Sequence, residues 1–121
     1  DNGKAINPTM VHGQLEGCTA TGISTALYEE LVVDKGVVLN PSFMDYKVPS
    51  SLESLSSNSL KTILLDIPYE DGPFGAKGGG EVGMMTPTPA IVDAISDAIG
   101  IRIKNLPATS ERVLSELTKT Q

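Results

Sequence analysis

The sequence predicts an α+β fold, and three patterns in its 121 residues support this class. Apolar residues recur at helical spacing in separate segments, two β-branched runs flank a turn, and two further runs have the composition of strands. The predicted order is helix, β-hairpin, strand, glycine-rich loop, helix, strand, helix. Because helices and strands are mixed along the chain, α+β is the natural class.

The first helix is predicted between residues 12 and 31, where apolar residues recur every three or four positions and share one face that we expect to be buried. Three glycines in this segment would each cost a helix about 1 kcal/mol relative to alanine, so another backbone or a ligand is expected close by. A loop followed by a shorter helix from Gly22 is the open alternative. The apolar residues are Ala20, Ile23, Leu27 and Leu31, and the glycines are Gly13, Gly17 and Gly22.

A β-hairpin is predicted next, because the runs 31–33 and 37–39 flank Asp34-Lys35-Gly36, whose glycine suits a left-handed conformation. Residues 50–59 hold six serines and are expected to form an exposed connection. Residues 60–67 are apolar and β-branched enough for a strand, which Pro68 would end.

In the last third, Thr88 is the predicted N-cap of a helix that has proline at its first position and ends at Gly100. Residues 101–104 alternate as a half-buried strand, and Thr109 with Glu111 in the first turn opens a final short helix. The apolar residues of the two helices are Ala90, Ile91, Ala94, Ile95, Ala98 and Ile99, and then Val113, Leu114 and Leu117.

Composition excludes several classes of function. A net charge of −6 argues against a nucleic-acid partner, since such binding depends on Lys and Arg neutralising phosphates. Cys18 and His12 are the sole residues of their types, so this chain alone can complete neither a disulfide nor a zinc or iron–sulfur site. No apolar run is long enough for a membrane span and no signal peptide is visible, so we expect a cytoplasmic protein without a membrane partner.

The loop 72–83 is the most informative segment, because six of its twelve residues are glycine and would let a backbone approach a ligand. The Gly-Lys-Ser/Thr ending of a nucleotide-binding loop is absent, which argues against an ATP site. Glu81 is the candidate general base, because we expect glycine walls to desolvate its carboxylate and raise its pKa. The alternatives are a solvated carboxylate, a helix cap, or a carboxylate whose pKa is lowered by Lys77.

Several strings resemble, in the same order, the end of the large subunits of molybdenum hydroxylases. These strings occupy residues 12–17, 26–30, 39–49, 72–81 and 89–91, with supporting matches at 7–8 and 106–114. The chain is thus similar to the C-terminal part of the molybdopterin-binding subunit of the xanthine dehydrogenase/aldehyde oxidoreductase family. It begins without Met at a turn-like Asp1-Asn2-Gly3, and we interpret residues 1–121 as a fragment of that cofactor-binding domain.

The resemblance implies that Glu81 deprotonates a molybdenum-bound water or hydroxide, whose oxygen attacks an electrophilic carbon of an aldehyde, purine or other N-heterocycle. Hydride then passes to a sulfido ligand, and the electrons leave through iron–sulfur clusters and usually FAD in partner domains or subunits. The molybdopterin is expected to be shared with the remaining domains, and this chain supplies no metal ligand. By the same resemblance, cofactor binding falls to Gln14, Lys77, Gly78, Gly79 and Gly80.

Three departures from the family pattern lie near the expected pocket and leave the substrate open. Thr21 stands where glutamine is common, Cys18 where a small residue is commoner, and Met84-Met85 where proline often follows the glutamate. We expect 121 residues alone to be inactive. The alternative function is a stand-alone, non-catalytic remnant that acts as a structural or interaction module and self-associates through an exposed apolar patch.

Overall fold

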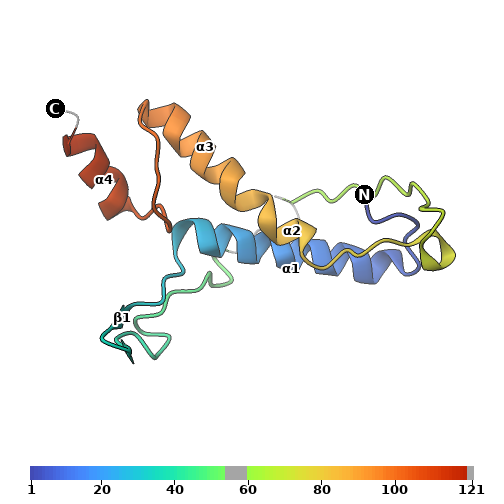
Figure 1. The fold of residues 1–121 in the computed structure, drawn as a ribbon, viewed down its shortest axis with the longest axis horizontal. Helices are drawn as coiled ribbons and strands as arrows, with labels where there is room; N and C mark the ends of the chain where they lie inside the picture. Colours follow the sequence, from blue (N-terminus) through green and yellow to red (C-terminus); the bar gives the residue numbers. More distant parts are fainter. Residues whose placement is uncertain (54–59, 120–121) are drawn as a thin grey trace.

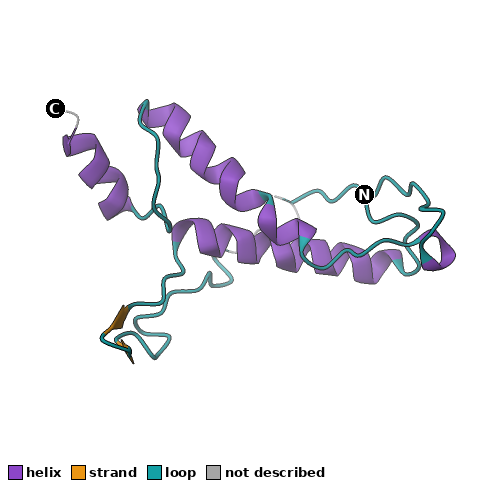
Figure 2. Cartoon of the chain, in the orientation of Figure 1, coloured by secondary structure: helices purple, strands orange, loops and turns teal. Residues whose placement is uncertain are grey.

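A computed structural model describes residues 1–53 and 60–119 (Figure 1). Its longest element is α1 (Pro8–Leu27), and α3 (Pro87–Ile99) diverges from it, preceded by the one-turn helix α2 (Val82–Met85). The last helix, α4 (Ser110–Lys119), lies beyond the end of α1. Much of the rest is loop (Figure 2), and none of the described helices combines the length and apolarity that a membrane crossing needs.

Helix α1 is continuous through all three of its glycines, so the alternative of a loop before Gly22 is wrong. It begins four residues earlier than predicted, because Asn7 caps it by accepting a hydrogen bond from the Met10 N–H at 3.2 Å, with Pro8 at the first helical position. It ends at Leu27, and Leu31 is exposed outside it. The buried residues of α1 are Gly22, Ser24 and Ala26, whereas the apolar residues predicted to be buried are half-buried within the helix. The helix was therefore predicted correctly, but its buried residues and both of its ends were not.

The expected close approach to a helix glycine is confirmed at Gly22. A Cβ at this position would lie 2.7 Å from Met84 O and 3.1 Å from the Pro87 side chain, so α1 meets the start of α3 here. Thr88 does not cap α3 as predicted, since its Oγ1 donates to Gly22 O at 2.9 Å, and the helix begins at Pro87, two residues before the predicted first position. At Gly13 and Gly17 a Cβ would meet no atom within 4 Å.

The predicted hairpin is confirmed as strands β1 (Val33–Asp34) and β2 (Val37–Val38), which pair antiparallel with Val33 opposite Val38. Lys35 and Gly36 have φ values of 47° and 81°, the left-handed pair that a two-residue turn of type I′ needs. Asn40 closes the hairpin's base: its side chain accepts from the Val32 N–H at 2.9 Å and donates to Glu30 O at 2.6 Å.

The two single strands predicted at 60–67 and 101–104 are wrong. Both segments are irregular, and in the described part of the chain neither pairs with a strand. Ile103 is buried, but its N–H donates to Ser96 Oγ at 3.1 Å instead of joining a ladder. β-Branched composition favours a half-buried sheet position only where a neighbouring strand is present. Of the serine-rich connection 50–59, residues 54–59 lie outside the described residues.

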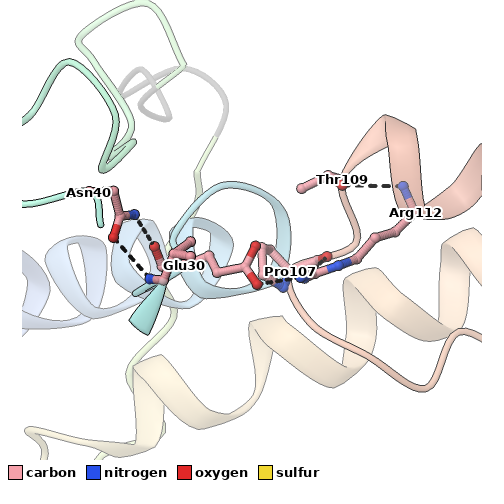
Figure 3. Close-up of polar contacts among 6 residues, drawn as sticks. Glu30, Asn40, Pro107, Thr109 and Arg112 are labelled. Carbon is pink, nitrogen blue, oxygen red and sulfur yellow. Dashed lines mark hydrogen bonds and ion pairs between the residues drawn. The ribbon is translucent and has the colours of Figure 1, made fainter. Parts of the chain in front are cut away.

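Polar contacts fasten α4 to the end of α1 (Figure 3). The Ala108 N–H donates to Ala26 O at 2.6 Å, while the Arg112 guanidinium pairs with Glu30 and donates to Pro107 O at 3.0 Å. Thr109 caps α4 as predicted, since its hydroxyl accepts from the Arg112 N–H at 3.3 Å.

The described residues form helices and one small antiparallel sheet, which confirms the α+β class although not the predicted order of elements.

Candidate functional site

The start of the chain pairs with the glycine-rich loop. Gly3 and Ala76 form an isolated antiparallel bridge, the Lys4 N–H donates to Gly75 O at 2.8 Å, and the Lys77 N–H donates to Asn2 O at 2.8 Å. Gly3 has a φ of 64°, and a Cβ there would lie 2.3 Å from Gly75 O, so only glycine fits. Residues 2–4 therefore hold one side of the loop in place.

Lys77 does not pair with Glu81. Its ammonium lies 2.5 Å from the Asp1 carboxylate and 5.7 Å from the centroid of the Tyr69 ring. Its backbone N–H donates to Asn2 O, so the N–H and the ammonium of Lys77 both attach the loop to the start of the chain. The alternative in which Lys77 pairs with Glu81 is therefore wrong for the described part of the chain.

Gln14 and Cys18, one turn apart on α1, meet the other side of the loop. Cys18 Sγ donates to Gly80 O at 2.6 Å, and Gln14 Nε2 donates to Cys18 Sγ at 3.4 Å. The loop position directly before Glu81 is thus attached to the helix that carries the predicted cofactor-binding amide. The Gln14 and Glu81 regions, 67 positions apart in sequence, are brought together here.

The helix that follows the loop packs tightly on the same part of α1. A Cβ added to Gly83 would lie 2.8 Å from Cys18 Cβ, closer than real side chains approach, and 3.4 Å from Leu15 O. Only glycine permits this contact between α2 and α1. The loop is therefore fixed on both sides, by residues 2–4 before it and by α1 beneath its end.

Glu81 stands at the start of α2 with its side chain exposed. Its carbonyl accepts from the N–H groups of Met84 at 3.0 Å and Met85 at 3.2 Å, while its carboxylate makes no capping bond. The expectation that the glycines desolvate this carboxylate is wrong for the described part of the chain, because glycines lack the side chains that would cover it. Here Glu81 matches the alternative of a solvated carboxylate.

The loop offers hydrogen-bond donors that the described residues leave unused. The backbone N–H groups of Gly78, Gly79, Gly80 and Glu81 donate to no acceptor within residues 1–53 and 60–119. A Cβ on Gly78 would meet nothing within 4 Å, and one on Gly80 would meet only Gln14 Nε2, at 3.9 Å. Consecutive free amides suit an anionic, acceptor-rich group such as the phosphate-bearing pterin of molybdopterin.

Asn2 is a site residue that the sequence did not reveal. The residue is 6% exposed, its Nδ2 is buried with no hydrogen-bond partner among the described residues, and a Cβ on Gly79 would lie 2.2 Å from that atom. The described residues include no cluster of three or more His, Cys, Asp or Glu side chains that could hold a metal ion. The donors present thus fit the organic part of a cofactor rather than a free ion.

Comparisons with known proteins agree on one family. The family model for the molybdopterin cofactor-binding domain matches residues 1–54. The 6-hydroxypseudooxynicotine dehydrogenase complex subunit gamma of Paenarthrobacter nicotinovorans is 41% identical over 116 residues, which cover 93% of this chain and 14% of that protein. The putative xanthine dehydrogenase molybdenum-binding subunit of Escherichia coli strain K12 is 34% identical over 118 residues, covering 96% of this chain and 15% of that protein.

A solved structure extends the likeness to the fold. Quinoline 2-oxidoreductase from Pseudomonas putida 86 superposes with a TM-score of 0.88 at 31% identity, and the match covers 98% of this chain and 15% of that one. The chain therefore spans about 15% of the length of these relatives. Its sequence and its fold together show that this chain belongs to the molybdopterin-binding subunit family of xanthine dehydrogenases and aldehyde oxidoreductases.

Proposed function

We propose that this chain is part of a molybdenum-dependent hydroxylase, to which it contributes the catalytic base Glu81 and one wall of the molybdopterin pocket. One observation carries the proposal: the loop that ends in Glu81 presents, beside Gln14, four backbone N–H groups that donate to none of the described residues. Residues 1–121 would then be the C-terminal part of the cofactor-binding domain. Family membership and the donors of this loop support the same assignment.

In this proposal Gly78, Gly79 and Gly80 bind molybdopterin through their backbone N–H groups, and the Gln14 amide binds it from α1. An amide can donate and accept at once, so it suits a group that carries both kinds of atom. Lys77 has a different role, because its N–H donates to Asn2 O and its ammonium pairs with the Asp1 carboxylate. It holds the loop rather than the cofactor. When bound, the cofactor supplies the metal at which oxygen transfer and electron uptake take place.

Glu81 acts as a general base through its carboxylate. The side chain is exposed, and no described residue donates to it, so its oxygens are available to accept a proton from the water that supplies the product's oxygen atom. A base in this position contributes about 10²- to 10⁴-fold to a rate. The backbone of Glu81 is held at the start of α2, and this limits the positions that its carboxylate can reach.

We propose aldehydes, purines or other N-heterocycles as substrates, and iron–sulfur and flavin domains as electron-accepting partners. The relatives' names include a xanthine dehydrogenase, an aldehyde oxidoreductase and a quinoline oxidoreductase, which support this substrate range. Oxidation of a substrate releases electrons. One cysteine cannot bind an iron–sulfur cluster, so another domain or subunit must receive them.

Glu81→Gln in the complete enzyme tests the catalytic assignment. Glutamine keeps the size of the side chain but cannot act as a base, so we expect kcat to fall about 10²- to 10⁴-fold while molybdenum content is unchanged. Glu111→Gln, on the exposed first turn of α4, is the matched control and should retain full activity. Wild-type turnover by the Glu81→Gln enzyme would refute the assignment.

The second candidate is a non-catalytic module. It is favoured by the large number of exposed apolar side chains, through which such a module could self-associate. The hydrophobic residues buried in the described part are Ala26, Ile103 and Ala108. The native protein can be captured with an antibody against this chain and its mass and molybdenum content measured. A large molybdenum-containing complex supports the enzyme, whereas a metal-free 12.7 kDa species supports the module.

A further inference from the structure

We infer that Cys18 is a positioning residue for Glu81, and that it acts through the carbonyl group of Gly80. This inference rests on the proposed function of Glu81 as the base. In the sequence, Cys18 is one of the departures from the family pattern near the expected pocket. Three contacts of the thiol and its Cβ point to a more specific part in the site.

The first contact fixes the peptide that carries the base. Cys18 Sγ donates to Gly80 O, and this carbonyl belongs to the same planar unit as the N–H of Glu81. In a trans peptide the two groups point in opposite directions, so anchoring the carbonyl on α1 directs the Glu81 N–H away from α1. That N–H is one of the four donors that no described residue uses, and the Glu81 side chain begins at the adjoining Cα.

The second contact links the thiol to the proposed cofactor-binding side chain. Gln14 Nε2 donates to Cys18 Sγ at 3.4 Å, so the thiol serves as acceptor for one side chain and as donor to the loop. Sulfur forms weak hydrogen bonds in both directions. Cys18 therefore couples the orientation of the Gln14 amide to the position of the Gly80–Glu81 peptide.

The third contact limits what can replace the cysteine. Gly83 lies so close that a Cβ on it would be 2.8 Å from Cys18 Cβ, so the half-buried side chain of Cys18 lies directly against α2. A branched or larger residue at position 18 would push α2 outward. Serine keeps a donor of similar size, and alanine keeps the Cβ but removes the donor, so the two variants separate hydrogen bonding from packing.

The test compares Cys18→Ala and Cys18→Ser in the complete, molybdenum-loaded enzyme. Misplacement of a reacting group by about 1 Å costs on the order of 10²-fold, so we expect Cys18→Ala to lower kcat about 10- to 100-fold. KM should stay unchanged, since Cys18 is not proposed to touch substrate. Cys18→Ser should restore most of kcat, because its hydroxyl can donate to Gly80 O.

Amide hydrogen exchange gives a readout that does not depend on turnover. In the same proteins, Cys18→Ala should speed exchange in peptides covering residues 78–85, and Cys18→Ser should return it toward the wild-type rate. Thr25→Ala is the matched control, because Thr25 Oγ1 donates to Thr21 O at 2.9 Å on α1, away from the loop. It should change neither kcat nor exchange in residues 78–85.

The outcomes separate this inference from the proposed function. If Glu81→Gln inactivates the enzyme while Cys18→Ala leaves both kcat and exchange unchanged, the inference alone is overturned. If Cys18→Ala reduces both and serine restores neither, packing rather than hydrogen bonding is responsible, and the inference is also overturned. Should Cys18→Ala fail to accumulate, the Cys18→Ser enzyme decides: near wild-type kcat and exchange support a hydrogen-bonding role, and a loss of both contradicts it. If Glu81→Gln is fully active, the proposed function fails first.

Discussion

Gly83 is the residue that sets how closely α2 can approach α1. Replacing it with alanine would place a Cβ 2.8 Å from Cys18 Cβ, so the two helices must separate or distort. We predict that Gly83→Ala destabilises the folded protein by about 1–3 kcal/mol, the usual cost of overpacking. The measurement is thermal or urea unfolding of the purified protein that contains this chain.

Gly17→Ala is the matched comparison for Gly83→Ala. A Cβ at Gly17 would meet no atom within 4 Å, and the position is inside α1, where alanine is favoured over glycine by about 1 kcal/mol. We therefore expect the two substitutions to shift stability in opposite directions. Equal destabilisation by both would contradict the contact between α2 and α1.

The glycine-rich loop and the family strings predict Glu81 as a site residue, and the family strings predict Gln14, but the sequence did not predict their surroundings. Cys18 lies four positions after Gln14, so a shared helical face was visible, whereas the Gly80 carbonyl it meets is 62 positions away. Asn2 reaches Gly79 only because the chain start pairs with the loop, a contact that no local pattern encodes. The exposed side chain of Glu81 matches the alternative of a solvated carboxylate, because the neighbouring glycines have no side chains that could cover it.

Among the elements, those specified by neighbouring residues were predicted well. The hairpin followed from a turn whose two central residues have positive φ, and α3 ended as expected at Gly100, with a φ of 70°. The segments 60–67 and 101–104 failed as strands, because a strand exists only when its backbone pairs with another. Strand composition in a single segment carries no information about whether that partner is present.

The turn of the hairpin yields a second prediction. Gly36 has a φ of 81°, where a side chain costs about 1–2 kcal/mol, so Gly36→Ala should lower the stability of the hairpin by that order. Lys35→Asn should raise it slightly, since Asn-Gly is a preferred pair for a type I′ turn. Hydrogen exchange in residues 31–39 measures both, and faster exchange in Lys35→Asn would contradict the turn assignment.

Across the whole molecule, α4 is attached to the rest by few contacts. Arg112 bonds to both Glu30 and Pro107 O, yet its ion pair is partly exposed, so it contributes no more than about 1 kcal/mol. We predict that Arg112→Met speeds amide exchange throughout α4 and that high salt does so more weakly. Arg102→Met, an exposed control outside the helices, should leave α4 unchanged. Equal effects of the two substitutions would contradict this anchoring role.

The exposure of large apolar side chains can distinguish a part of a hydroxylase from a non-catalytic module. Met10 is 71% exposed and Met44 is 81% exposed, and Met10 lines a pocket with Lys77 and Gly79 of the glycine-rich loop. If residues 1–121 belong to a large hydroxylase, other domains should cover much of this surface, since exposed apolar patches mark interaction sites. We predict that hydrogen peroxide oxidises Met10 and Met44 several-fold more slowly in the native complex than in the urea-denatured protein, with peptide mass spectrometry as the measurement. Oxidation at the same rate in both states would mean that this surface is open and would favour the non-catalytic module.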